Sequence, residues 1–383
     1  MTISMEIEPA RAPYYRASES AWIVTRYEDA SRVLRASNVS IATGPGALIA
    51  RVSERLGGAF DDLAALVNGL PLFLSSPEHE RSRSFLHDIL RAMMKAYSPE
   101  NIDEAVIRLV EQVDDSADVD GMAICHSLPD LLFSEALGYS QDDLREMRVA
   151  GGRITGDWRP AMPISEYERR QTLSGRVRAT IGSSWRRRGC PVLGEAAYLT
   201  EANAAISQRD RDGALFFLAS IANDTMSAFL GNLLNLLATC QELQESLRRR
   251  PGLMSGFVEE ALRYCGPVRF RARVVGRGAL ELGETILPEG ALAHVVLESA
   301  NRDPIVYSEP HQFDPERRGP PPLAFGAGSH ICVGAIFARR LTKRFLHVLL
   351  ERYAIYPGAS PSRLSPSRDL RRFDALPLRL RPL

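Results

Sequence analysis

A single cysteine stands inside a glycine-rich loop in the last part of the chain. Residues 323–340 read LAFGAGSHICVGAIFARR, which places Cys332 two residues after His330 and at the start of an apolar helical stretch. Glycines in such a loop allow tight bends and a close approach of the backbone to another group. A cysteine in this setting is either a small buried hydrophobe or a ligand. The chemistry of the chain depends on which of the two it is.

Three other kinds of site use similar loops, and the spacing of residues excludes each of them. A dinucleotide fingerprint needs a third glycine where Ile331 stands. Covalent heme attachment needs CxxCH, which the chain lacks. A zinc site needs more cysteine or histidine at short spacing, and only His330 is near Cys332. What is left is one thiolate at a helix N-terminus, which suits an axial ligand of heme iron that favours O–O cleavage.

A long apolar stretch carries the second group of chemically interesting residues. Residues 212–243 are apolar on nearly every side, which predicts a helix buried all round. Asn223, Asp224 and Thr225 interrupt it, and this argues against a membrane span. The three polar residues form either a helix kink with satisfied hydrogen bonds or an acid–alcohol pair that faces a cavity. The residues by themselves leave both interpretations open.

The elements that must position these residues are mainly helical. Residues 21–37 are expected to form a short strand, a turn and a helix. Apolar residues recur at helical spacing elsewhere, and the pattern predicts helices over 76–97, much of 99–150, 165–187, 252–265 and from Cys332 to about Tyr353. Alternating apolar residues with turn signals within 268–299 predict a small β region. A proline-rich, irregular segment, 303–322, then leads into the cysteine loop. Residues 357–383 are expected to form a loop with a short hairpin, RFDALPLRL.

Composition narrows the class of protein. The 383 residues contain 47 Lys and Arg and 47 Asp and Glu, so no basic surplus points to nucleic acid. The N-terminal residues lack a basic start followed by an apolar core, and the sequence therefore predicts no signal peptide and no membrane anchor. The cysteines are odd in number and show no pairing pattern, which indicates a reducing cytoplasm. They are Cys125, Cys190, Cys240, Cys265 and Cys332.

The cysteine loop closely resembles the heme-binding signature of the cytochrome P450 family. FGAGSHICVG matches FGxGxHxCxG at every fixed position, and the likeness extends over nearly the whole chain. The resemblance implies a soluble, bacterial-type protein, mainly α with small β-sheets, whose long central helix lies over the heme. It implies one domain over 1–383, with N- and C-terminal strands joining the β region. Its cofactor would be heme b, with Cys332 as the iron ligand and Phe325 and Gly326 as cofactor-binding residues.

The family's ExxR pair is present as Glu260 and Arg263. Three residues apart on a helix, the two side chains share a face and can bond. The family uses this pair to lock the core behind the heme, with a third partner from the irregular segment, and Arg317 in FDPER fits that partner. A surface ion pair would contribute little. The order and spacing relative to Cys332 favour the structural pair.

Four residues are expected to hold the heme propionates. His79 and Arg83 match the family's HxxxR, and the spacing of four puts both on one helix face, where they can meet a single anionic group. His330 would also reach a propionate. In the β region Arg273 is the expected contact, with Arg271 as a rival because the spacing is one residue off the commonest pattern. Arginine suits this role because its fork binds carboxylates in bidentate fashion.

The polar interruption in the central helix resembles the family's oxygen-activation motif, AGxDT or AGxET. The chain reads IANDTM over 221–226, and the resemblance assigns proton transfer to Asp224 and Thr225. Ile221 and Ala222 replace the usual alanine and glycine, and Met226 replaces a common second threonine. These departures concern the shape of the pocket and the distortion of the helix, since the acid and the alcohol are both present.

The resemblance predicts the substrate-facing residues only by region of the chain. The family's pocket segments give seven candidates, Phe217, Leu218, Ile221, Val268, Arg269, Phe270 and Phe373, with Leu66 and Val67 in the loop before HxxxR. The apolar ones are equally expected as ordinary core. Arg269 either holds an anionic substrate in the pocket or is a solvated surface arginine.

The electrons must come from elsewhere, because the chain has no flavin or iron–sulfur motif. The resemblance implies a ferredoxin and a ferredoxin reductase as partners. A basic run follows the cysteine loop on the next helix, and it either docks an acidic ferredoxin or is a solvated helix face. The run consists of Arg339, Arg340, Lys343 and Arg344.

The expected function is that of a heme-thiolate monooxygenase. It would oxidise a small organic molecule with O2, and an intermediate of a secondary-metabolite pathway is the expected substrate. A second possibility uses the same oxidant for C–C or C–N coupling or for ring rearrangement without net hydroxylation. A third is a heme-binding protein without catalysis, and Asp224 and Thr225 count against it because a sensor needs no proton relay.

Overall fold

The computed structural model describes residues 11–41, 44–111, 118–156, 158, 162–185 and 206–383. The chain divides into two compact units. The first unit comprises residues 1–42, 99–125 and 225–383, and the second comprises residues 43–98 and 126–224. All the described strands and the cysteine loop belong to the first unit, whereas the described elements of the second are helical.

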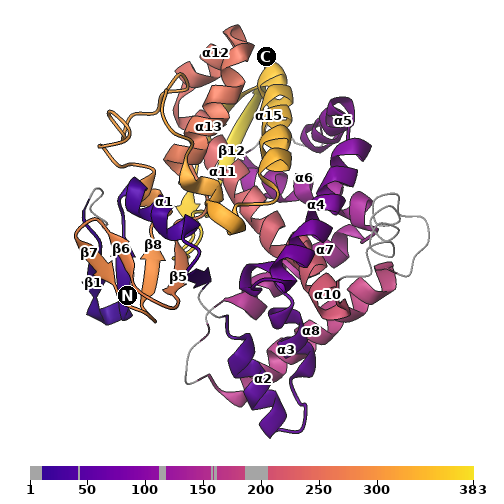
Figure 1. The fold of residues 1–383 in the computed structure, drawn as a ribbon. Helices are drawn as coiled ribbons and strands as arrows, with labels where there is room; N and C mark the ends of the chain where they lie inside the picture. The colour runs from indigo at the N-terminus through magenta and orange to yellow at the C-terminus, as the bar shows by residue number, and fades with distance from the viewer. Residues whose placement is uncertain (1–10, 42–43, 112–117, 157, 159–161, 186–205) are drawn as a thin grey trace. The chain divides into compact units, whose positions relative to one another are not determined.

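A five-stranded sheet joins the beginning of the chain to the β region in the first unit (Figure 1). Its strands, in spatial order, are β1 (Tyr14–Arg16), β2 (Ala21–Val24), β8 (Leu292–Val295), β5 (Arg271–Val275) and β3 (Val39–Ile41). The pair β2–β8 is parallel, with Trp22 opposite Ala293, and the other pairs are antiparallel. The hairpin of β6 (Leu280–Leu282) and β7 (Thr285–Leu287) also lies within the predicted β region.

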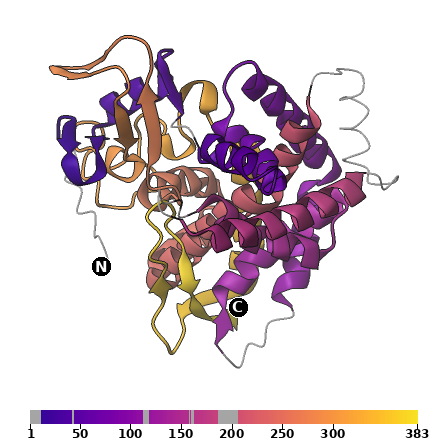
Figure 2. The same ribbon diagram turned by 90° about the horizontal axis from the view of Figure 1, so that it is seen from below.

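The hairpin predicted near the C-terminus is wrong. β11 (Phe373–Ala375) pairs with β10 (Arg363–Leu364), whereas β12 (Pro377–Pro382) lies between β4 (Val119–Asp120) and β9 (Tyr353–Pro357). The strands β9 to β12 are yellow in Figure 2. The side chains of Leu376, Leu378 and Leu380 are buried, which fits a half-buried strand. The second half of the predicted hairpin therefore pairs with strands that are distant in the sequence.

Besides part of the central helix, which is described below, several helices belong to the first unit. They are α1 (Tyr27–Arg35), α5 (Pro99–Val110), α12 (Gln241–Arg249), α13 (Met254–Cys265), α14 (Leu297–Ala300) and α15 (Ala335–Arg352). α15 packs against α5, where the Arg344 guanidinium binds both carboxylate oxygens of Asp103. The prediction that a helix follows the cysteine loop as far as about Tyr353 is confirmed.

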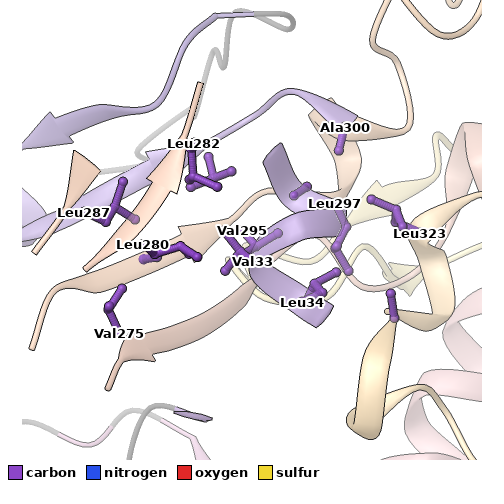
Figure 3. Close-up of a cluster of buried hydrophobic side chains, with 14 of the residues drawn as sticks. Val33, Leu34, Val275, Leu280, Leu282, Leu287, Val295, Leu297, Ala300 and Leu323 are labelled. Carbon is purple, nitrogen blue, oxygen red and sulfur yellow. The ribbon is translucent and has the colours of Figure 1, made fainter. Parts of the chain in front are cut away.

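One hydrophobic cluster of the first unit anchors the cysteine loop (Figure 3). Leu34 from α1, Leu297 from α14 and strand residues such as Val295 pack together there. Leu323 and Ala327 from the loop join the same cluster and are 3% and 2% exposed. Burying one large aliphatic side chain contributes about 1.5–3 kcal/mol. The loop is therefore tied to the core on both sides of Gly326.

The second unit is a packing of helices. They are α2 (Gly46–Arg55), α3 (Asp61–Asn68), α4 (Glu78–Ala96), most of α6 (Gly121–Leu137), α7 (Gln141–Thr155), α8 (Ile164–Trp185) and α10 (Gln208–Phe217). The residue after α3, Gly69, meets Gly213 of α10 so closely that a Cβ on Gly213 would lie 2.1 Å from the Gly69 carbonyl. These two elements therefore touch backbone to backbone.

The central helix is continuous from Gln208 to Thr239, but it changes geometry on the way. A π-helical turn, η3 (Leu218–Ala222), separates α10 from α11 (Asn223–Thr239). The helix ends before the predicted limit of 243 because Cys240 adopts an extended conformation. By length and composition it is the one described helix that could cross a membrane, yet 67% of its most apolar window is buried. That burial agrees with the expected core helix.

Candidate active site

The backbone of the cysteine loop is bent by two glycines in the left-handed region. Gly326 has φ of 73° and Gly328 has φ of 72°. A Cβ on Gly328 would lie 2.3 Å from the carbonyl oxygen of Leu34 in α1, so the loop passes directly against that helix. The Cys332 N–H donates to the Phe325 carbonyl over 2.9 Å. Side chains are therefore excluded at Gly328, and the loop returns on itself to present Cys332.

Cys332 differs from the other described cysteines in its surroundings. It is exposed and precedes α15, whose N-cap is Gly334, and a helix N-terminus stabilises a thiolate. Cys125 and Cys265 are buried. Burial raises the pKa of the Cys265 thiol to about 12 and raises the pKa of Cys125 further. The two buried cysteines behave as hydrophobes, whereas Cys332 has the surroundings of a ligand.

Glu260 and Arg263 form a bidentate ion pair inside the first unit. Both N···O distances are 2.7 Å, and the side chains are 3% and 2% exposed. Arg317 donates to the same carboxylate over 3.1 Å and 3.2 Å, and the Asp314 N–H also bonds it. The contact expected of Arg317 is present, and the pair is not the surface pair considered as the alternative. Its function in supporting the heme stays a proposal.

Asn301 links this ion pair to the cysteine loop. Its carbonyl accepts from Arg263 over 3.0 Å, and its side-chain oxygen accepts from the Leu323 N–H over 2.7 Å. Asn301 is 3% exposed, so both bonds are sheltered from water. Sequence reasoning did not identify this residue. Its only local signal is its place in a turn that ends in Asp303-Pro304.

Two arginines project from the same face of β5. Arg271 and Arg273 are two residues apart on a strand, and the Arg273 side chain is buried. Burial, and then the charge of Arg271, lower the pKa of Arg273 to about 10. The Arg273 guanidinium bonds the Ala272 carbonyl over 2.9 Å, and no carboxylate of the described ranges pairs with it. A buried guanidinium without a carboxylate suits an anionic ligand such as a propionate.

The second unit holds three of the predicted site residues, His79, Arg83 and Asp224, whereas His330 lies in the first unit with the cysteine loop. His79 is buried on α4, and Arg83 lies one turn further along the same face. Burial, and then the positive charge of Arg83, lower the pKa of His79. Asp224 ends this unit, and Thr225 begins the next part of the first unit. Both are half-buried, and they follow the π turn directly.

A buried polar contact next to this turn did not emerge from the sequence. Asn223 is fully buried, and its amide donates to Asp130 on α6 over 2.7 Å. The second oxygen of Asp130 accepts from Arg148 on α7 over 3.3 Å. Of the two interpretations left open for the polar interruption, satisfied hydrogen bonding therefore applies to Asn223.

The substrate candidates have different surroundings. Leu218 and Val268 are buried, together with Leu66 and Val67. Phe217, Ile221, Phe270 and Phe373 are half-buried. Arg269 donates to Glu298 over 2.8 Å, and Glu298 also binds Arg371. The carboxylate partner of Arg269 is therefore an internal one.

The basic run after the loop is also partly neutralised within the chain. Arg339 binds both oxygens of Glu259 and lies over the Phe325 ring, with its guanidinium carbon 4.6 Å from the ring centre. Arg344 is paired with Asp103, as described above. Two of the four cations proposed for ferredoxin docking thus already have carboxylate partners, which weakens a purely electrostatic docking surface.

Comparison with known proteins agrees with these features. The family model described as Cytochrome P450 matches residues 214–368. The chain is similar to Cytochrome P450 107B1 of Saccharopolyspora erythraea, with 28% identity over 367 residues that cover 90% of this chain and 85% of the relative. The structure of CalO2 superimposes with a TM-score of 0.83 at 22% identity and covers 97% of this chain and 94% of that one. The structure of an epothilone B-bound cytochrome P450epoK superimposes with a TM-score of 0.81 at 21% identity. It covers 98% of this chain and 94% of that one.

The fold is that of the solved cytochrome P450 structures, and the cysteine loop carries the residues that suit a heme-thiolate site. The family model over residues 214–368, the curated relatives and the solved structures all support a bacterial-type cytochrome P450 monooxygenase. The family binds heme iron and uses O2, small-molecule substrates and redox partner proteins. The donor groups fit a heme, because an exposed cysteine stands at a helix N-terminus and a buried arginine of the same unit lacks a carboxylate partner among the described residues.

Proposed function

We propose that this P450 inserts one oxygen atom from O2 into a small organic molecule, an intermediate of a secondary-metabolite pathway. Heme b is the proposed prosthetic group. A ferredoxin and its reductase are the proposed electron donors. The odd, scattered cysteines support a cytoplasmic location. The observation that carries the proposal is the cysteine loop, whose backbone turns expose Cys332 at the start of α15.

Each residue has a definite task in this proposal. A heme ligated by a cysteine thiolate supplies the oxidising chemistry when it is bound. Cys332 would provide the thiolate, with Phe325 and Gly326 beside it in the loop. Arg273 and His330 of the first unit, together with His79 and Arg83 of α4, would hold the propionates. Their charges and ring nitrogens suit carboxylates.

Proton delivery is assigned to the central helix. Asp224 and Thr225 would pass protons to the reacting oxygen, because an acid and an alcohol in sequence can relay a proton through water. Glu260, Arg263 and Arg317 would keep the loop in place from behind, through Asn301. The substrate would contact the half-buried Phe217, Ile221, Phe270 and Phe373.

The decisive experiment is the difference spectrum of the reduced protein with carbon monoxide. A red-shifted Soret band is expected for thiolate ligation, and a band typical of imidazole ligation would refute the assignment of Cys332. Substrate screening by spin-state shift would follow, with turnover supported by a surrogate ferredoxin and reductase. A hydroxylated product supports the proposal, whereas a coupled or rearranged product without added oxygen would replace it. Thiolate heme without any turnover would indicate a non-catalytic binding protein.

A further inference from the structure

The central helix leaves α geometry just before its acid–alcohol pair. The π turn Leu218–Ala222 ends one residue before Asn223, and Asp224 and Thr225 follow. Single π turns are rare and are frequently found at functional sites. Because each turn changes the rotation of all later residues, the contacts that fix this turn also set the direction of Asp224 and Thr225.

The residue that follows the π turn, Asn223, has a fully buried side chain that is held by a hydrogen bond to α6. The Asn223 amide nitrogen donates to Asp130 Oδ1 over 2.7 Å, although the two residues are 93 positions apart in the sequence. Asp130 is 6% exposed, and its Oδ2 accepts from Arg148 Nη2. A buried amide that lost its partner would bear the full cost of desolvation. The bond therefore fixes the rotation of the first residue of α11.

A second contact presses on the turn from α7. A Cβ on Gly151 would lie 2.7 Å from Ser220 Cβ, so the absence of a side chain lets α7 approach the turn closely. Arg148 is three residues before Gly151 and shares its helix face. The Ser220 hydroxyl donates to the Phe216 carbonyl over 2.6 Å, within the same distorted segment. α6 and α7 thus meet the turn at adjacent points.

We propose that Asp130 is a positioning residue for oxygen activation and acts through Asn223 on the turn that carries Asp224 and Thr225. It does not touch substrate or cofactor in this role. The inference rests on the proposed function of Asp224 and Thr225 in proton delivery. Loss of the Asp130–Asn223 bond lets the turn relax, and the acid and alcohol then spend less time in the productive direction. Reducing equivalents are lost as hydrogen peroxide.

The test compares two substitutions at Asp130 in the heme-loaded enzyme. Asp130→Leu is similar in size and removes the carboxylate that accepts from both Asn223 and Arg148, so we expect a several-fold rise in peroxide formed per reducing equivalent. Asp130→Asn retains a bond, because Asn223 can turn its amide and accept from the new one while Arg148 keeps an oxygen. We therefore expect near-normal coupling in Asp130→Asn. Equal coupling in Asp130→Leu and the unaltered enzyme would overturn the inference.

A second variant keeps the inference testable if Asp130→Leu fails to fold. Asn223→Leu leaves the Asp130–Arg148 pair intact, and it should raise peroxide by a similar factor. The double variant should add little to either single change, because both remove the same bond. Amide hydrogen exchange over 216–225 should become faster in both single variants. Unchanged exchange in both would also contradict the inference.

Two control variants distinguish the proposed role of Asp130 from the proposed proton delivery by Asp224 and Thr225. Ser184→Ala removes a 2.6 Å bond to the Leu137 carbonyl at the end of α6, so it loosens that helix without touching the turn. We expect normal coupling in this variant, and a rise equal to that of Asn223→Leu would reduce Asp130 to a general packing role. Thr225→Ala tests the proposed function itself. If Thr225→Ala leaves coupling unchanged, proton delivery is misassigned, whereas uncoupling in Thr225→Ala but not in Asn223→Leu refutes only the role of Asp130.

Discussion

The cysteine loop and the π turn of the central helix are held in place by different means. The loop depends on its own backbone bonds, two left-handed glycines and a core cluster, and a buried ion pair reaches it through Asn301. The turn depends on side chains of α6 and α7. A short stretch with several supports close together in sequence resists small changes, whereas a turn that depends on distant side chains is more sensitive to the loss of one of them. Substitutions in the loop should therefore lower heme binding and the free energy of unfolding. Substitutions at the turn should raise the peroxide formed per reducing equivalent.

The largest effect is expected at the centre of the loop. Cys332→Ala removes the proposed iron ligand, so the thiolate band of the reduced, carbon monoxide-bound protein should disappear completely. The loop should keep its fold because its backbone bonds and core contacts do not involve the sulfur. Circular dichroism and the carbon monoxide spectrum measure the two properties separately. A retained thiolate band would show that another residue is the ligand.

The next effect concerns the buried ion pair behind the loop. Glu260→Gln leaves Arg263 and Arg317 facing a neutral amide, and breaking a buried pair costs about 3–5 kcal/mol. Denaturant unfolding and heme content should both fall. The neighbouring Glu259→Gln is the matched control, because its pair with Arg339 is 41% and 30% exposed and is worth about 1 kcal/mol or less. Equal losses in the two variants would contradict the assignment of the support to Glu260.

Two glycines of the loop offer a smaller, paired test. Alanine in the left-handed region costs about 1–2 kcal/mol at either position. Gly328→Ala should cost more than this, because its Cβ would collide with the Leu34 carbonyl, while the nearest atom to a Cβ at Gly326 lies 3.8 Å away. Thermal unfolding of Gly326→Ala and Gly328→Ala measures the difference. Equal melting temperatures would mean that α1 moves enough to accommodate the added Cβ at Gly328.

The smallest effect is expected at the start of α7. Ser140 and Asp143 form a reciprocal capping box, and Ser140→Ala should lower stability by about 1 kcal/mol. The cap is two helical turns before Arg148, so peroxide formation should stay normal in spite of the lost stability. A rise in peroxide comparable to that of Asn223→Leu would indicate that coupling follows overall stability. The distinction between loop and turn would then fail.

The predictable parts of the site are those whose residues lie close together in the sequence. FGAGSHICVG specifies a loop whose bonds join residues a few positions apart, and Glu260 and Arg263 sit three apart on one helix. The helical and β regions were also predictable, because apolar periodicity is a local signal. Arg317 required the family resemblance, since nothing local relates it to Glu260.

The parts that were not predicted depend on distant partners. Asn223 bonds Asp130 across 93 positions, and Asn301 links the ion pair to the loop only because Arg263 and Leu323 both donate to it. The C-terminal strand was misassigned for the same reason, because β12 pairs with β4 and β9 and not with its neighbour in sequence. A pattern shows that a residue is polar or alternates with others, but it does not name the partner that satisfies it.

The parallel pairing of β2 with β8 has a consequence for biosynthesis. Trp22 leaves the ribosome early, but its partner Ala293 is made only when most of the chain exists. At the roughly 5–20 residues per second of protein synthesis, this interval is on the order of 10–50 s. During that time β1 and β2 have an unpaired edge that is open to other chains. The nascent enzyme is therefore most prone to aggregation before its sheet closes, and a chaperone that covers the first strands would raise its yield.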